Sequence, residues 1–176
     1  RCATQPGRVT TLATPTLIKT KAEEALAGSF LAASSRLPGS AAIGAMRRSA
    51  IERFAARGLP HRLVEEWKYT DLRNLLKEAY PAAVGAGEAA REIADGAIAG
   101  TLDGIFGGLD AYVVVIVDGV FVRSSVAFEG VECIALEQAL ASDGPAWVGN
   151  ALQHAANDSD SVVALNTAFM SSGVAL

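Results

Sequence analysis

The sequence contains few of the residues that bind metals or form disulfides. Its 176 residues include two cysteines, Cys2 and Cys133, and two histidines, His61 and His154. The cysteines are far apart and neither histidine lies near one. A structural zinc site takes its ligands from closely spaced pairs, so we expect this chain to hold no metal. Cys133 is interpreted as a small buried strand residue in a protein of the reducing cytoplasm.

Sequence motifs of catalysis are also missing. A phosphate-binding loop needs a glycine followed by lysine, and no Gly-Lys pair occurs. No G-x-S-x-G nucleophile motif occurs either. His154 falls on an apolar face of a predicted helix together with Trp147 and Ala151, which is more typical of a packed histidine than of a catalytic base. The sequence therefore predicts a protein that is not an enzyme.

No hydrophobic run approaches the roughly 18 residues that a membrane helix requires. Hydrophobic residues nevertheless make up 51% of the chain and the mean hydropathy is +0.28, too apolar for a disordered protein. Aromatic residues contribute only 6%. These values predict a folded domain with one core and no membrane partner.

Positive charge is concentrated in the first part of the chain. The net charge is +3 over residues 1–46, +4 over residues 47–77 and −11 over residues 78–176. A chain divided in this way favours docking between its own halves or onto a charged protein face. It argues against a continuous nucleic-acid surface.

Three helices are predicted in the basic part. The first spans about residues 15–34, with Glu23 and Glu24 facing outward. The second spans residues 40–57 and is capped by Ser40. The third spans residues 70–79 and starts at Thr70 and Asp71. The predicted apolar faces consist, in order, of Ile18, Ala22, Ala25, Ser29 and Ala33, widened by Leu26 and Phe30; of Ile43, Met46, Ala50 and Phe54; and of Leu72, Leu75, Leu76 and Ala79. The opposite face of the second helix carries Arg47, Arg48, Glu52, Arg53 and Arg57.

The acidic part alternates helices with short strands. A helix is predicted near residues 88–99, followed by a loose turn through Gly104, Gly107 and Gly108. Residues 112–117 and 120–124 read as strands joined by a tight hairpin at Asp118-Gly119, with the first strand buried on both faces. A third strand near residues 131–134 completes a small sheet. Further helices follow at 136–141, after Asp143-Gly144-Pro145, and after Asp158 or Asp160, the last ending at Gly173. The fold class is α+β.

A connector of unusual composition, residues 58–72, links the second and third helices. Gly58 ends one helix and Pro60 prevents its continuation. Trp67 lies between them and the next helix as a packing anchor, with Lys68 close enough to lie over an aromatic ring. The candidate structural or interface residues of the connector are Gly58, Pro60, Arg62, Glu66, Trp67, Lys68, Tyr69 and Thr70.

The order G-L-P-x-R-x-x-E-x-W-K-Y-T-x-L over residues 58–72 resembles the N-terminal region of the SufD family. That family is the non-ATPase scaffold subunit of the Suf machinery for iron–sulfur cluster assembly. Residues 113–122 and the sequence A-L-N-T-A-F at 164–169 fit the same family in the same order. SufB is less similar, because its front region lacks the W-K-Y-T sequence.

The resemblance implies partners rather than chemistry within this chain. A SufD protein pairs with SufB through a long β-helical core, and both bind the ATPase SufC. The cluster-handling cysteines and histidines lie in that core and in the C-terminal segment, which are missing here. Residues 15–173 would form the N-terminal α+β domain, with a basic helical part at 15–80 and an acidic part at 81–173. This region would hold no cofactor and serve a structural or interaction role.

Two other functions remain open from the residues alone. Gly85-Ala86-Gly87 fits the relaxed dinucleotide fingerprint, with Asp103 beyond it, which would suit a small nucleotide-binding or transferase domain. That fingerprint needs a buried strand directly before its glycines, and Pro81 argues against one. The other alternative is a stand-alone adaptor whose basic helix docks an acidic partner.

The two ends of the sequence carry their own expectations. Residues 1–14 contain Arg1 and Arg8, lack acidic residues and read as a disordered leader. Residues 174–176 read as the start of the truncated core. A chain end that normally continues into further structure is expected to fray.

Overall fold

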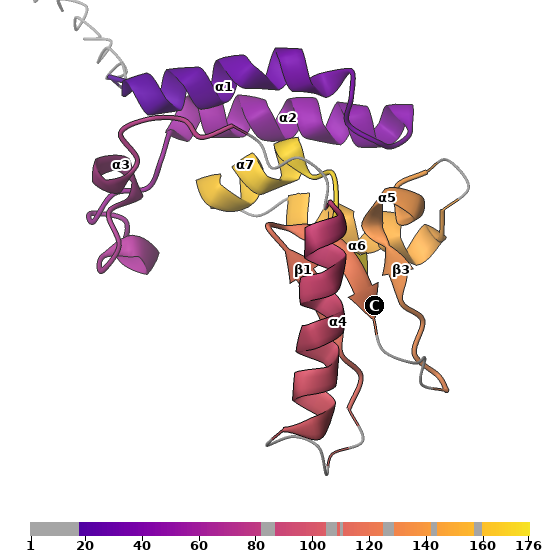
Figure 1. The fold of residues 1–176 in the computed structure, drawn as a ribbon. Coiled ribbons are helices and arrows are strands. Elements are labelled where there is room, and N and C mark those ends of the chain that lie inside the picture. The colour runs from indigo at the N-terminus through magenta and orange to yellow at the C-terminus, as the bar shows by residue number, and fades with distance from the viewer. Residues whose placement is uncertain are drawn as a thin grey trace, which may run out of the picture.

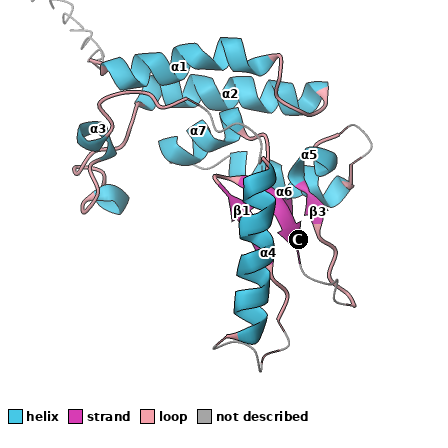
Figure 2. Cartoon of the chain, viewed as in Figure 1, coloured by secondary structure: helices cyan, strands magenta, loops and turns pink. Residues whose placement is uncertain are grey.

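Two long helices form one layer of the molecule. A computed structural model describes residues 18–81, 87–104, 109, 111–124, 129–141, 144–156 and 160–176. Helices α1 (Lys21–Ser34) and α2 (Ala41–Arg57) lie side by side, with α7 (Ser161–Phe169) packed against them (Figure 1). Helix α4 (Glu88–Asp103) extends away from this layer and packs against a β-hairpin. Helices and two small antiparallel sheets together confirm the predicted α+β class (Figure 2).

Helix α1 begins later than predicted, at Lys21 and not near residue 15. Thr20 caps it: its hydroxyl accepts the amide of Glu23, and the Glu23 carboxylate accepts the amide of Thr20. This reciprocal capping box fixes the start. Residues 15–17 lie outside the described part of the chain. The predicted apolar stripe was therefore wrong at its first member, because Ile18 precedes the helix and is 83% exposed.

The buried face of α1 agrees only in part with the predicted one. Ala22 and Phe30 are buried, whereas Ala25 and Ser29 are exposed. Glu23, expected to face outward, is only 2% exposed. Its carboxylate accepts hydrogen bonds from the backbone amides of Thr20 and Leu59, which compensate for the loss of water around a buried charge.

The hydrophobic core lies where α1, α2 and α7 meet. Phe54 of α2 is fully buried, and the Phe30 ring meets Phe169 edge to face at 5.8 Å between centroids. Small residues of α7 allow close approach to α2. The buried members of this cluster are Phe30, Ala50, Ile51, Phe54, Leu59, Ala164 and Ala168. Ser40 caps α2 as predicted.

One basic residue of α2 points into the protein instead of outward. Arg47 is only 3% exposed, and its Nη2 donates to the carbonyl oxygen of Met170 at 2.6 Å. Met170 follows the last residue of α7, so the guanidinium meets the negative end of that helix. Burial lowers the pKa of Arg47 below its ordinary value. The remaining charged residues of that predicted face, Arg48, Glu52, Arg53 and Arg57, are exposed or half-buried.

The third predicted helix is much shorter than 70–79. A 3₁₀ turn, η1 (Glu65–Trp67), is followed by α3 (Leu72–Leu75), a single turn capped by Asp71. Leu76 already has extended backbone angles, and Leu75 is 67% exposed. Leu76 packs against the core from this extended segment. Since one turn gains little from its own hydrogen bonds, the apolar pattern alone does not extend the helix.

The acidic part begins with α4 and a hairpin. Strands β1 (Val114–Val117) and β2 (Val120–Ser124) pair antiparallel, and α4 contacts both. Asp118 and Gly119 both have positive φ, 50° and 80°, as the predicted tight turn requires. The expectation of burial on both faces was wrong: Ile116 is 47% exposed, because this sheet has two strands and one helical cover. Gly107 and Gly108 of the predicted turn lie outside the described residues.

The predicted third strand joins a different sheet. Strand β3 (Ile134–Ala135) pairs with β4 (Val174–Ala175), not with the hairpin. Val174 and Ala175, which were expected to fray, pair with β3 in this sheet. The Phe121 amide donates to the Ser172 hydroxyl at 3.2 Å, which links the hairpin to this segment.

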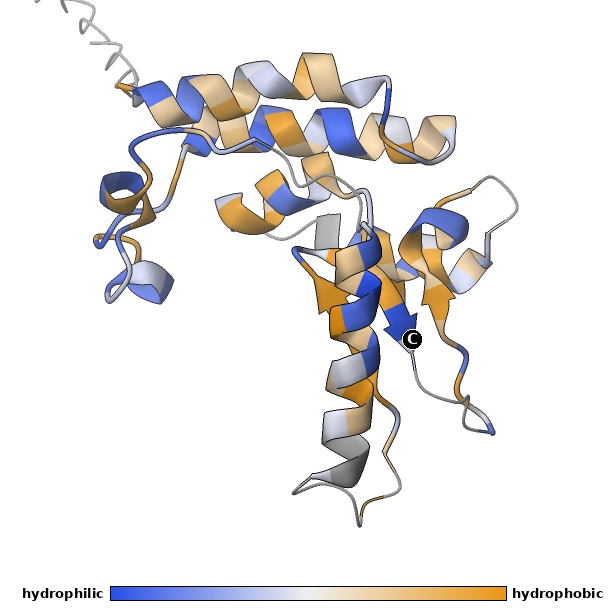
Figure 3. Ribbon diagram, viewed as in Figure 1, coloured by the Kyte–Doolittle hydropathy of each residue, from blue (hydrophilic) through white to orange (hydrophobic). Residues whose placement is uncertain are grey.

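Two helices follow β3 along the chain and precede α7. They are α5 (Leu136–Ala139) and α6 (Ala146–Ala156). Val148 is buried in α6, whereas Trp147, Ala151 and His154 are exposed, so the prediction of a packed histidine was wrong. Most strand residues are coloured as hydrophobic in Figure 3, whereas α1 and α2 carry both hydrophobic and hydrophilic residues, as amphipathic helices do. No helix within the described ranges is long and apolar enough to cross a membrane.

Candidate interaction site

The connector at residues 58–72 is held at its start by a buried carboxylate. Gly58 ends α2 with φ of 73°, a conformation that favours glycine. The next residue, Leu59, is 2% exposed, and its amide donates to Glu23 Oε1 at 2.8 Å. Arg73 Nε lies 3.4 Å from the same carboxylate oxygen. The predicted end of the second helix before Pro60, at Gly58, is thus confirmed. Glu23 of α1 holds the start of the connector in place.

The middle of the connector is anchored to α7 through Trp67. Its indole Nε1 donates to Asp160 Oδ2 at 2.8 Å. The other oxygen of Asp160 accepts the Val162 amide at 2.6 Å and caps α7. One carboxylate therefore starts the last helix and holds the connector, two positions 93 residues apart. This hydrogen bond joins Trp67 to the start of α7, and the anchoring role of Trp67 stays a prediction.

The residues after Trp67 face solvent. Lys68 pairs with Glu65 at 2.6 Å and its ammonium lies 5.3 Å from the Tyr69 ring centroid, as predicted for a neighbouring ring. Tyr69 itself is 92% exposed, and Thr70 is exposed. These side chains do not support the core, which leaves them available for contact with other molecules.

Asp71, not Thr70, begins α3. Its carboxylate accepts the Asn74 amide at 3.0 Å and the Asn74 side-chain amide at 2.7 Å. Partial desolvation raises the pKa of Asp71, but the hydrogen bonds from Asn74 and from the Arg62 amide, with the Arg62 charge, outweigh this and place the pKa below its ordinary value. Asp71 is therefore ionised near neutral pH and fixes the turn that carries Arg62.

Two cavities flank the connector. One, of about 560 Å³, lies between the start of α1, the connector and α3, and includes Arg62 in its lining. The other, of about 580 Å³, lies between the end of α2, the connector and the start of α7, and includes Glu66 and Trp67. His61 borders both. Among the predicted connector residues, Gly58 and Pro60 are buried, and Lys68, Tyr69 and Thr70 face solvent. The cavity-lining residues include Arg62, Glu66 and Trp67.

Glu23 and Arg73 hold the connector in place, although neither was among the predicted site residues. Thr20-x-x-Glu23 is a capping-box pattern and could have revealed the start of α1. Nothing in the pattern predicts that the same carboxylate also accepts an amide 36 residues away. Arg73 lies within the predicted third helix, and the helical pattern there indicated no partner for its side chain. In the structure its guanidinium donates to the Ile18 carbonyl.

The other candidate residues of the sequence analysis lie apart from this site. Cys133 is half-buried beside Tyr112, whose pKa is raised by its hydrogen bond with Cys133. Gly87 precedes α4 as its cap, and Gly85, Ala86 and Cys2 lie outside the described residues. Among the described residues, no group of three or more metal-ligating side chains comes together.

Comparisons with known proteins identify the family. The model of the SufBD protein N-terminal region matches residues 30–176, which include the connector and every strand of the structure. No curated protein and no solved structure matches the chain significantly. The match covers most of the chain, and it agrees with the resemblance carried by the connector. The chain therefore belongs to the SufBD family of iron–sulfur cluster assembly proteins and carries the N-terminal region of that family.

Proposed function

We propose that this chain is the N-terminal region of a SufD-like subunit and serves the SufB–SufC–SufD assembly as a non-catalytic scaffold. In this assignment it holds no cofactor itself. The cluster is built on the complete complex in the cytoplasm, with SufB and SufC as partners bound through other parts of the subunit.

The observation that carries the proposal is the anchored connector. Its W-K-Y-T sequence resembles SufD and not SufB. In the structure, the residues of that sequence differ in their contacts and in their exposure. Trp67 is tied to Asp160, whereas Tyr69 is 92% exposed. An exposed aromatic residue beside an anchored one suits a protein contact, because aromatic residues are enriched at binding hot spots and an anchored segment has less conformational entropy to lose on binding.

A domain exchange tests the assignment to SufD. The chain would replace the N-terminal region of SufD in a bacterium whose iron–sulfur enzymes depend on the Suf pathway, and separately that of SufB. We expect aconitase activity and copurification of SufB and SufC to be restored in the SufD exchange. Restoration only in the SufB exchange would assign the chain to the other branch of the family.

The non-catalytic part of the proposal has its own test. The purified chain would be incubated anaerobically with ferrous iron and sulfide and then desalted. We expect no retained iron and no cluster absorbance in the visible spectrum. Stoichiometric iron that survives desalting would show that the chain holds a cluster and would refute the scaffold-only role.

A further inference from the structure

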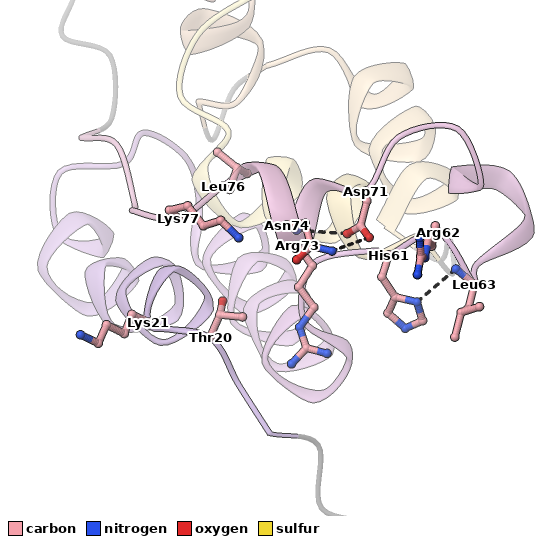
Figure 4. A pocket seen from close by; sticks show the side chains of 10 residues that line it. All are labelled: Thr20, Lys21, His61, Arg62, Leu63, Asp71, Arg73, Asn74, Leu76 and Lys77. Atoms are coloured by element: carbon pink, nitrogen blue, oxygen red, sulfur yellow. Dashed lines mark hydrogen bonds between the residues drawn. The ribbon is translucent and has the colours of Figure 1, made fainter.

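The cavity beside α1 is lined by an excess of positive charge. Four cationic side chains, Lys21, Arg62, Arg73 and Lys77, border it against the single carboxylate of Asp71 (Figure 4). We call this cavity the basic pocket. Its volume of about 560 Å³ is within the range of specific binding sites. A pocket with this charge selects for anions.

The cationic side chains of the basic pocket differ in whether they already form ion pairs or hydrogen bonds within the protein. Arg73 forms the inner wall, where it meets Glu23 and the Ile18 carbonyl. Lys77 is exposed and makes no hydrogen bond or ion pair within the described part of the chain. Figure 4 shows its ammonium directed toward the side of the pocket where Arg73 lies. The pocket thus has a fixed cation and at least one that is free to meet a ligand.

The acidic part of the chain does not line this pocket. Every lining residue falls between positions 20 and 77, whereas the net charge of −11 belongs to residues 78–176. The negative charge of Asp71 is engaged by Asn74. The positive charge of the pocket is therefore complementary to a ligand that the described lining does not supply.

Exposed apolar side chains beside the pocket narrow the class of ligand. Leu63 lines it and is 85% exposed. Tyr69, Leu75 and Tyr80, close by in sequence, are 92%, 67% and 76% exposed. A small inorganic anion bound in the pocket would leave most of this exposed apolar surface uncovered. A polypeptide with both acidic and apolar residues would use the charges and the apolar surface together.

We infer that the basic pocket receives the carboxylates of an acidic segment of a partner protein, while apolar residues of that segment cover the exposed side chain of Leu63. The inference rests on the pocket and its surroundings and does not require the assignment to SufD.

A titration with a defined polymer tests the inference on the 176-residue chain. The probe is a fluorescently labelled copolymer of glutamate and tyrosine, and sodium tripolyphosphate serves as the competing small anion. The pocket variant is Arg62→Gln/Lys77→Glu. The control Arg36→Gln/Arg48→Glu makes the same charge change at exposed positions outside the pocket. Gln at position 62 avoids placing a second carboxylate beside Asp71.

We expect the pocket variant to bind the copolymer on the order of tenfold more weakly than the wild type, with the control nearly unchanged. Thermal midpoints of both variants establish that they remain folded. Two results would overturn the inference directly: no binding of the copolymer by the wild type at low salt, or an equal loss of affinity in both variants. Displacement of the copolymer by tripolyphosphate at a concentration far below that of the copolymer's carboxylates would also overturn it.

Discussion

The carboxylate of Glu23 accepts the backbone amide of Leu59 at 2.8 Å, although 36 residues separate them in the chain. The same side chain accepts the Thr20 amide at 2.6 Å and faces Arg73. One buried group therefore fixes the start of α1 and the path of the chain after α2. The position of the connector depends on this contact more than on the stability of its own short helical turns.

Replacement of Glu23 by alanine should destabilise the fold strongly. The substitution leaves two amides without their acceptor, so we expect a loss of about 3 kcal/mol in the free energy of unfolding, measured by urea denaturation. Glu24→Ala is the matched control, since Glu24 is the exposed neighbour on the same turn. If both variants lose the same amount, the inward hydrogen bonds contribute nothing beyond helix propensity.

The Trp67–Asp160 hydrogen bond should be measurable by a double-mutant cycle. Trp67→Phe removes the indole donor and should cost about 1 kcal/mol. Asp160→Ala removes this acceptor and the cap of α7, so a loss of about 2 kcal/mol is expected. The double variant should lose less than the sum, because the shared bond is counted twice in the single variants. Strict additivity would mean that the bond does not contribute to stability.

Arg47 should matter far more than the adjacent Arg48. Arg47→Ala removes a buried charged donor from the Met170 carbonyl and leaves space in the core. We expect a loss of about 3 kcal/mol in the free energy of unfolding. Arg48 is exposed, so Arg48→Ala should change stability by no more than about 0.5 kcal/mol. A comparable loss in the two variants would contradict the inward position of Arg47.

Local signals in the sequence predicted the elements that local chemistry determines. Ser40 begins α2, Gly58 ends it, and Asp118-Gly119 forms the hairpin turn, because each depends on one or two side chains and their backbone angles. An anchoring role for Trp67 is also predicted, since a large ring in a chain poor in aromatic residues has few other roles.

Predictions failed where a distant partner decides the outcome. Glu23 and Arg47 are charged and were expected to face solvent. Both are buried, because Glu23 accepts the Leu59 amide and Arg47 donates to the Met170 carbonyl. The apolar pattern over residues 72–79 suits a helix, yet only one turn forms at Asp71. Strand β3 was expected beside the hairpin and pairs instead with β4. Such pairings have no local signature, because the two members are far apart in sequence.

The charge of Asp71 should make the stability of the chain depend on pH. The pKa of Asp71 lies below its ordinary value in the fold, chiefly because the hydrogen bonds from Asn74 outweigh the opposing desolvation. A carboxyl group of this kind stabilises the fold above its unfolded pKa of about 3.9, and that contribution is lost as the pH falls through the folded pKa.

Asp71→Asn isolates this effect, because asparagine still caps α3 but cannot ionise. We expect the wild type to be more stable than the variant at pH 7, and the difference in the free energy of unfolding to shrink below about pH 4. Urea denaturation across this range provides the measurement, and Asn74→Ala should weaken the same pH dependence because it removes the side-chain donor. A wild-type advantage that stays constant down to about pH 3 would show that the charge of Asp71 is not favoured by the fold, since only a depressed pKa produces the loss in acid.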